Sequence, residues 1–120
     1  MTLWIGIDVA KATLAVHFHP DGQSLSLLNT PDDVARLIAL IDGRPVGNVL
    51  LEASGGYERG LMRALARAQV PVTRINPRRA KAFAQALGRI AKTDPIDAAV
   101  LARMAEVVVQ TRTTPSAEQE

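Results

Sequence analysis

The sequence predicts an α/β domain in which a mixed sheet is flanked by helices, with an antiparallel three-stranded meander followed by parallel strands. The first observation is that three strand-like apolar runs open the chain, ahead of any helical pattern. The second is that helical and strand-like segments alternate afterwards. The third is composition, because 120 residues with 48% hydrophobic content and a mean hydropathy of +0.08 suit one compact domain with a core.

The opening meander is predicted from turn residues between apolar runs. Leu3 to Val9 and Thr13 to Phe18 are separated only by a short Ala-Lys-Ala segment, which is typical of a β-hairpin. Pro20-Asp21-Gly22 is a turn signal, and Ser24 to Leu28 would return as a third strand.

A helix and a strand-loop-helix unit follow. Thr30-Pro31-Asp32-Asp33 predicts a helix start, with proline in the first turn and acids facing the dipole, and Gly43 ends this helix. Val49 to Glu52 is a short apolar strand that ends in its glutamate. After Ala53-Ser54-Gly55-Gly56, a second helix has apolar residues at helical spacing.

The last predicted elements are a strand and two helices. Val70 to Ile75 is the strand. Asn76-Pro77 caps a helix that runs to about Leu87 and ends at Gly88. The final helix runs from about Pro95 to Val108.

Composition argues against several classes of protein. No run reaches the roughly 18 apolar residues that span a bilayer, and the N-terminus lacks a signal-peptide pattern, so we expect a soluble cytoplasmic chain with no membrane contact. Without cysteine the chain has no disulfide framework and no thiolate metal site. Any bound metal would therefore take oxygen or imidazole ligands.

Four carboxylates form the candidate site. Asp8 follows the apolar run Trp4 to Ile7, Glu52 ends a second apolar run, and Asp94 and Asp97 lie in one short motif. An unpaired charge in a buried strand would cost several kcal/mol unless a cation compensates it, and a divalent metal would do so. The i, i+3 spacing puts Asp94 and Asp97 on one helix face, where both could serve one ion.

Each carboxylate also has a purely structural interpretation. Asp8 could be a strand-end aspartate turned toward water, and Glu52 could begin a loop. Asp-Pro-Ile-Asp is a good helix start, in which Asp94 would be the N-cap, Pro95 the first helical residue and Asp97 the third. The capping and metal interpretations are compatible, because Asp94 and Asp97 on one helix face could cap the helix and also offer both carboxylates to one ion.

Positive charge is concentrated in one segment. Residues 59 to 92 hold nine Lys/Arg and no Asp/Glu, although the formal net charge is only +2. Arginine predominates, which suits bidentate phosphate contacts, whereas ordinary solvated helix faces usually mix signs. We therefore expect this segment to form a nucleic-acid face. Its basic residues are Arg59, Arg63, Arg67, Arg74, Arg78, Arg79, Lys81, Arg89 and Lys92.

Four motifs in order carry a specific resemblance. They are Gly6-Ile7-Asp8-Val9-Ala10-Lys11, Leu51-Glu52-Ala53-Ser54-Gly55-Gly56-Tyr57, Asn76-Pro77 with a basic helix, and Lys92-Thr93-Asp94-Pro95-Ile96-Asp97-Ala98. Over almost its whole length the chain resembles the N-terminal domain of DEDD-type insertion-sequence transposases, which are similar to the Piv DNA invertase. The resemblance implies an RNase H-like fold, as in RuvC Holliday-junction resolvases.

The resemblance also implies metal-dependent DNA cleavage and strand transfer through the tetrad Asp8, Glu52, Asp94 and Asp97. Mg²⁺ or Mn²⁺ would be the cofactor, since Mg²⁺ prefers oxygen ligands and two hard cations about 3.5 to 4 Å apart can activate a nucleophile and stabilise a leaving oxygen. DNA would be the partner. The residues expected to contact nucleic acid are Lys11, Arg74, Arg78, Arg79, Lys81, Arg89 and Lys92.

Length departs from the family pattern. Relatives carry a further C-terminal domain with a serine implicated in strand transfer, some use a structured guide RNA, and we expect a homo-oligomer for the full-length protein. Residues 1–110 would be the catalytic domain and 111–120 a polar tail that leads to the missing domain. This chain alone would then bind DNA or nick it slowly.

Two other functions fit parts of the sequence. An actin-like ATPase or sugar kinase shares the opening hairpin, but Val9-Ala10-Lys11-Ala12 lacks the glycine that a phosphate loop needs for close backbone approach. A DNA-binding or oligomerisation module without catalysis is the other alternative.

Overall fold

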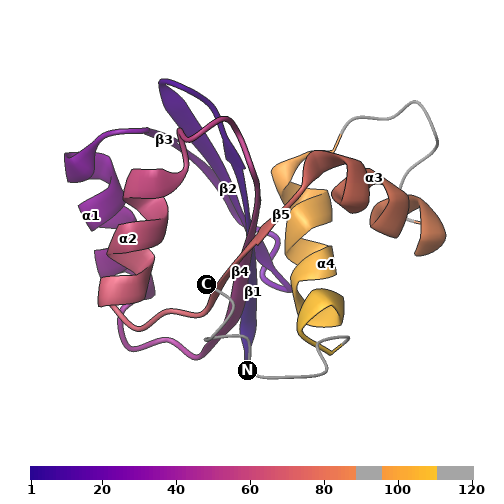
Figure 1. The fold of residues 1–120 in the computed structure, drawn as a ribbon. Helices are drawn as coiled ribbons and strands as arrows, with labels where there is room; N and C mark the ends of the chain where they lie inside the picture. The colour runs from indigo at the N-terminus through magenta and orange to yellow at the C-terminus, as the bar shows by residue number, and fades with distance from the viewer. Residues whose placement is uncertain (89–95, 111–120) are drawn as a thin grey trace.

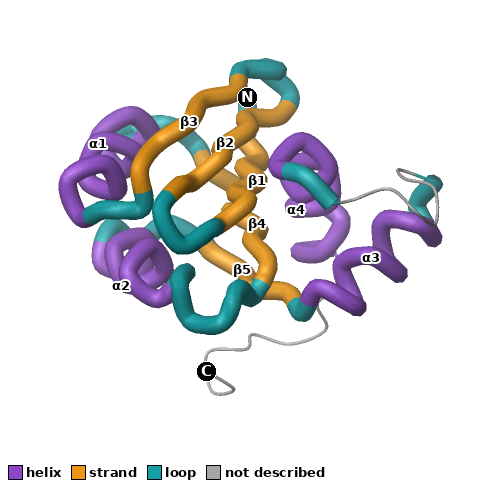
Figure 2. Tube along the Cα trace, turned by 90° about the horizontal axis from the view of Figure 1, so that it is seen from above, coloured by secondary structure: helices purple, strands orange, loops and turns teal. Residues whose placement is uncertain are grey.

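The structure has three layers, with a five-stranded sheet between helices on both of its faces (Figure 1). The computed structural model describes residues 1–88 and 96–110. Helices α1 and α2 cover one face of the sheet, and α3 and α4 lie on the other (Figures 1 and 2). The elements are β1 (Leu3–Val9), β2 (Thr13–His19), β3 (Ser24–Leu28), α1 (Pro31–Ile41), β4 (Val46–Glu52), α2 (Arg59–Arg67), β5 (Val72–Ile75), α3 (Pro77–Ala86) and α4 (Ala98–Gln110).

The sheet has the strand order β3-β2-β1-β4-β5. β2 pairs antiparallel with both β1 and β3, which makes the predicted meander. β4 pairs parallel with both β1 and β5, and the crossover connections contain α1 and α2. The predicted mixed sheet and the predicted order of elements are confirmed. None of the helices among the described residues is long and apolar enough to cross a membrane.

β4 begins at Val46, three residues earlier than predicted. The sequence Gly47-Asn48 is typical of a loop, but here Asn48 is a strand residue with only 1% of its surface exposed. Its amide nitrogen donates to the carbonyl of Ala105 in α4 (3.2 Å), and its amide oxygen accepts from the hydroxyl of Thr73 in β5 (3.1 Å). A buried polar group with satisfied hydrogen bonds can occupy a central strand.

The start of β5 also differs from the prediction, at Val72 rather than Val70. The N–H of Val70 donates back to the carbonyl of Leu65, so this residue belongs to the turn that leaves α2. Pro71 has no N–H to give to a strand ladder.

Side chains alternate along the strands and fill a separate core on each face of the sheet. The larger core contains Ile5 and Ile7 of β1, packed with Leu37 of α1 and Leu61 of α2. The smaller core contains Leu50 of β4, together with apolar residues of α3 and α4. Alternate side chains of β1 and β4 therefore face α1 and α2 on one side of the sheet, and α3 and α4 on the other.

Helix α4 lies directly on β1, and Gly6 is the residue that allows this close approach. A Cβ atom at Gly6 would collide with the backbone oxygen of Ala98 and the backbone nitrogen of Ala102. Ala102 is fully buried in this contact. Glycine is thus required here for backbone approach rather than for an unusual φ angle.

Candidate active site at the carboxyl ends of β1 and β4

Asp8 and Glu52 lie on the same face of the sheet, at the carboxyl ends of adjacent strands. Gly6 faces α4, so Asp8, two residues later in β1, points to the α4 side as well. Leu50 belongs to the core under α3 and α4, and Glu52 follows it by two residues at the end of β4. The strands are in register, with Ile7 opposite Leu51, so the two carboxylates are neighbours.

The structure agrees with the structural interpretation of Asp8 as an aspartate turned toward water and differs from that of Glu52 as the start of a loop. Asp8 is exposed although both of its sequence neighbours are buried, and it lies near the carboxyl end of the central strand β1, on the face that α4 covers. An exposed carboxylate does not carry the full cost expected for a charge inside a buried strand. Glu52 is partly buried and is the last residue of β4, so it does not begin a loop.

Asp97 lies just before α4, whose first residue is Ala98, and is near enough to Asp8 for its charge to act on that carboxylate. A carboxylate oxygen of Asp97 accepts a hydrogen bond from the N–H of Val100 (2.9 Å), and its carbonyl accepts from Leu101 (3.0 Å). Asp97 is therefore the N-cap of α4, and the predicted assignment of Asp97 to the third helical position is wrong. Asp94, the predicted N-cap, lies outside the described residues, as do Arg89 and Lys92.

Electrostatic effects link three of the four carboxylates. Partial burial raises the pKa of Asp8, and the negative charge of Asp97 raises it further. Partial burial also raises the pKa of Glu52; the charge of Asp8 adds to this rise, and the charge of Lys81 opposes it. Asp8 therefore interacts with both other carboxylates, and Lys81 lies on the Glu52 side of the group.

The chemistry of these donors fits a hard divalent cation. Carboxylate oxygens are the ligands that Mg²⁺ and Mn²⁺ prefer, and the pKa values of Asp8 and Glu52 are raised first by burial and second by a neighbouring negative charge, both of which a bound cation would offset. Among residues 1–88 and 96–110, however, no three His, Asp or Glu side chains lie close enough together to hold a metal ion. The described part of the site thus contains carboxylates of the kind that bind Mg²⁺, but not three of them close enough together to hold the ion.

The structure divides the basic segment 59–92 between the two helical layers, so its residues do not share one face, and which of them contact nucleic acid stays a prediction. The arginines of α2 lie in the α1/α2 layer, whereas those of α3 lie on the side of the carboxylates (Figures 1 and 2). Arg78 and Arg79 are exposed in the first turn of α3, and Asn76 caps their backbone N–H groups. Lys11 is exposed in the bend after β1, at the same end of the strand as Asp8.

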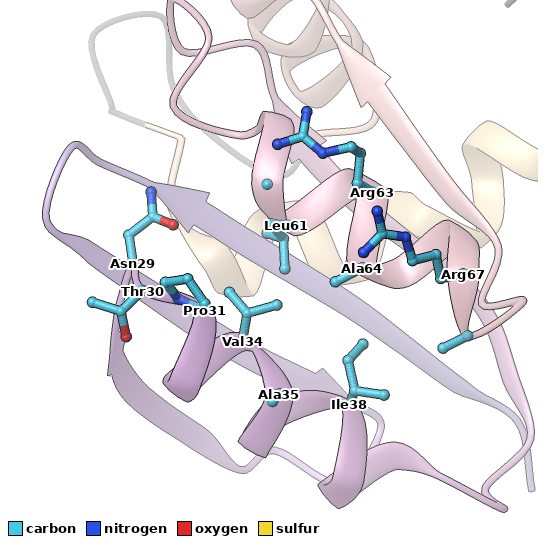
Figure 3. Close-up of a pocket in the computed structure, with 12 residues that line it drawn as sticks. Asn29, Thr30, Pro31, Val34, Ala35, Ile38, Leu61, Arg63, Ala64 and Arg67 are labelled. Atoms are coloured by element: carbon cyan, nitrogen blue, oxygen red, sulfur yellow. The ribbon is translucent and has the colours of Figure 1, made fainter.

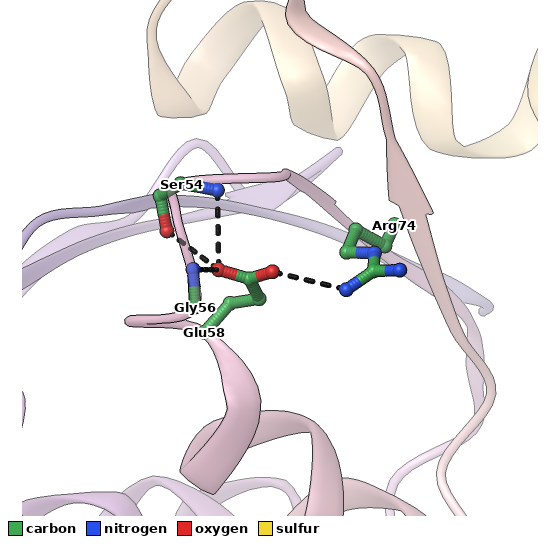
Figure 4. A network of polar contacts seen from close by, with 4 residues as sticks. All are labelled: Ser54, Gly56, Glu58 and Arg74. Carbon is green, nitrogen blue, oxygen red and sulfur yellow. Dashed lines mark hydrogen bonds and ion pairs between the residues drawn. The ribbon is translucent and has the colours of Figure 1, made fainter.

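Glu58 is a buried residue at the site that the sequence analysis missed (Figure 4). One of its carboxylate oxygens accepts hydrogen bonds from the hydroxyl of Ser54 (2.8 Å), the N–H of Ser54 (3.1 Å) and the N–H of Gly56 (3.2 Å). The other oxygen forms an ion pair with Arg74 (3.1 Å). Arg74, predicted to contact nucleic acid, is thus used at least in part inside the protein.

These contacts decide the charge of Glu58. Burial alone would raise its pKa, but the hydrogen bonds from Ser54 and from the backbone, together with Arg74, lower the pKa to about 2. The buried carboxylate is therefore ionised and holds the loop that leaves β4 directly after Glu52. The one feature of the sequence that could have indicated Glu58 is its position directly before residues 59–92, whose charged residues are all basic.

A family model described as a transposase, DEDD_Tnp_IS110, matches residues 5–120. The chain belongs to this transposase family. The structure of RuvC from T. thermophilus in complex with a Holliday junction substrate is similar, with a TM-score of 0.62 and 16% identity over 92% of this chain and 96% of that one. The transposase chain therefore has the RuvC-like, RNase H-like fold that the sequence predicts.

A second solved structure shares part of this architecture. The inorganic polyphosphate/ATP-glucomannokinase from Arthrobacter sp. strain KM aligns with a TM-score of 0.50 and 18% identity, over 78% of the transposase chain and 51% of the kinase. This similarity agrees with the kinase-like opening hairpin noted in the sequence. No match is found among curated protein sequences.

Proposed function

We propose that residues 1–110 are the catalytic domain of a DNA transposase that cleaves and transfers DNA strands in a metal-dependent reaction. The observation that carries this proposal is that the charge of Asp97 acts on Asp8 and the charge of Asp8 acts on Glu52 at the carboxyl ends of β1 and β4, although the three residues are far apart in the sequence. Asp94, three residues before Asp97, would complete the tetrad. Transposase family membership and the complex of RuvC with a Holliday junction support DNA as the substrate.

Mg²⁺ or Mn²⁺ would be held by these four carboxylates, and when bound it supplies an activated nucleophile and stabilises the leaving oxygen. Asp8 suits the central position among the ligands, because its charge acts on Glu52 and that of Asp97 acts on Asp8. Glu58 holds the loop behind Glu52 and so limits the movement of that carboxylate.

Basic residues around the carboxylates would bind the DNA backbone. Lys81 lies close enough to Glu52 to affect its pKa, and Arg78 and Arg79 are exposed one turn earlier on α3. Lys11 would contribute from the bend after β1, together with Arg89 and Lys92 from the segment before α4. We assign the activity to the bacterial cytoplasm; a guide RNA and a homo-oligomer remain predictions for a longer protein.

Thermal melting with and without Mn²⁺ tests the metal site. A cation that binds only the folded protein at 100 times its dissociation constant should add about 2.7 kcal/mol of stability. Asp8→Asn should lose this metal-dependent shift, whereas Asp32→Asn, an exposed aspartate of α1 on the other face, should retain it. A wild-type protein without any shift at millimolar Mn²⁺ would refute the shared metal site.

Two Asp97 variants separate the cap from the ligand. Asp97→Asn should keep the helix cap but weaken the Mn²⁺ shift, since asparagine still accepts from the N–H of Val100. Asp97→Ala should lose the Mn²⁺ shift and also about 1 kcal/mol of metal-free stability. If both variants keep the full Mn²⁺ shift, Asp97 is only a cap.

The similarity to the glucomannokinase makes ATP binding the second candidate. ATP or polyphosphate should therefore be included in the same melting experiment without DNA. Stabilisation by ATP, together with no Mn²⁺-dependent nicking of duplex DNA, would favour the kinase-like function over the transposase. We expect slow, Mn²⁺-dependent nicking that Asp8→Asn abolishes.

A further inference from the structure

A groove lies between α1 and α2, in the layer across the sheet from the carboxylates (Figure 3). Its volume is about 600 Å³. The two helices cannot fill this space because small residues face it, namely Gly60, Ala64 and Ala68 at four-residue intervals at α2 and Ala35 on α1. The remaining lining residues are Asn29, Thr30, Pro31, Val34, Ile38, Leu61, Arg63 and Arg67.

The floor of the groove is apolar. Val34 and Leu61 are buried, and the side chains of Val34 and Ile38 extend from α1 toward α2 (Figure 3). Ile38 and Ala64 remain partly exposed. Apolar surface that stays in contact with water in a concave site gains free energy when a partner covers it.

One rim of the groove is positively charged. Arg63 and Arg67 are exposed on successive turns of α2, and no acidic residue lines the groove. Neither side chain forms an ion pair within the described part of the chain, whereas three other arginines do so: Arg36 with Asp33, Arg44 with Asp21, and Arg74 with Glu58. Two cations at i, i+4 destabilise a helix slightly, so an external anion would be favourable.

We propose that this groove binds an amphipathic helix of a partner protein, with apolar side chains on the floor and acidic side chains against Arg63 and Arg67. Helices α1 and α2 have 11 and 9 residues, which gives walls of about 13 to 16 Å, the length of roughly three helical turns. Such a segment would supply apolar anchors at i, i+3 or i+4, and i+7. A nucleic-acid backbone would satisfy the guanidinium groups but leave the apolar floor uncovered.

Two synthetic helical peptides of sixteen residues provide the test. Both would carry leucine at the i, i+3, i+4 and i+7 positions. The glutamate peptide would have glutamate beside the leucines, and the lysine peptide would have lysine at the same positions. Fluorescence anisotropy with the 120-residue protein should show at least about tenfold tighter binding of the glutamate peptide. The double variant Arg63→Glu/Arg67→Glu should reverse this preference.

Ala64→Leu should fill the groove and weaken binding of both peptides about tenfold, with thermal melting used to verify that the variant folds. Arg103→Glu is the matched control, because Arg103 is an exposed arginine of α4 on the opposite side of the sheet. Its peptide binding should equal that of the wild type. Amide chemical shifts should move at α1 and α2 alone.

Three results would overturn the proposal. The first is that the wild type binds the two peptides with equal affinity, or that Arg103→Glu weakens binding of the glutamate peptide as much as Arg63→Glu/Arg67→Glu does. The second is that the protein binds neither peptide but binds a labelled DNA duplex, and that Arg63→Glu/Arg67→Glu abolishes the DNA binding. This result would make the surface a nucleic-acid site. The third is that the protein binds neither peptide, while sedimentation shows that the wild type is a dimer and that Arg63→Glu/Arg67→Glu is a monomer. None of these results would affect the carboxylate site, which is tested separately by Mn²⁺.

Discussion

Glu58 is the residue whose environment departs most from what its sequence position indicates. A carboxylate with 1% of its surface exposed is costly unless its charge is compensated, and here the compensation comes from one arginine and three donors of the loop after β4. Because that loop begins next to Glu52, the buried charge also stabilises the segment that follows this candidate catalytic residue.

The low pKa of Glu58 predicts a specific dependence of stability on pH. Its folded-state pKa of about 2 lies below the ordinary value of 4.5, so this stabilisation is complete above pH 4.5 and is lost as the pH falls toward 2. The contribution should be on the order of 3 kcal/mol. Urea unfolding at pH 7, 4.5 and 3 should show that Glu58→Gln is less stable at pH 7 and loses less stability on acidification. Parallel curves for variant and wild type would contradict the assigned pKa.

At the scale of elements, the sequence was sufficient where local patterns decide. Apolar runs, turn residues and Asn76-Pro77 predicted the order of strands and helices correctly, and the recurrence of carboxylates at strand ends pointed to Asp8 and Glu52. It was insufficient where distant contacts decide. Asn48 is a strand residue because α4 and β5 satisfy its amide, and Glu58 is buried because Arg74 on another strand pairs with it.

The contact between α4 and β1 positions Asp97, and Gly6→Ala tests this dependence. The added methyl group would meet backbone atoms of α4, which cannot rotate away as a flexible side chain could, so the helix must shift. We expect a loss of about 1 to 3 kcal/mol or more of unfolding free energy. The shift would also move Asp97 from Asp8, so the Mn²⁺-dependent rise in melting temperature should shrink. Gly60→Ala, where a Cβ atom has open space in helix α2, is the control: it should raise the unfolding free energy by up to about 1 kcal/mol and leave the Mn²⁺-dependent rise unchanged.

At the scale of the whole molecule, the sheet separates two kinds of basic surface. Arg78, Arg79 and Lys81 lie on the side of the carboxylates, and the arginines of α2 lie across the sheet beside the apolar groove. The charge count of the sequence could not distinguish them, because only the folded chain shows that α2 and α3 cover opposite faces of the sheet. The net charge of +2 therefore conceals two surfaces with different expected partners.

The salt dependence of DNA binding distinguishes these surfaces. Each phosphate contact on duplex DNA contributes about −0.9 to the slope of log affinity against log salt, because binding releases counterions. Arg78→Ala/Arg79→Ala should therefore reduce the steepness of the slope by up to about 1.8 and weaken binding at low salt.

Arg63→Ala/Arg67→Ala removes the same charge from the opposite face and is the matched control. Because the proposed DNA surface lies on the α3 side, this variant should keep the wild-type slope in fluorescence anisotropy titrations with a 20-base-pair duplex between about 50 and 200 mM salt. If the α2 variant loses as much slope as the α3 variant, DNA contacts both faces. An unchanged affinity and slope in Arg78→Ala/Arg79→Ala would rule out the start of α3 as a DNA contact.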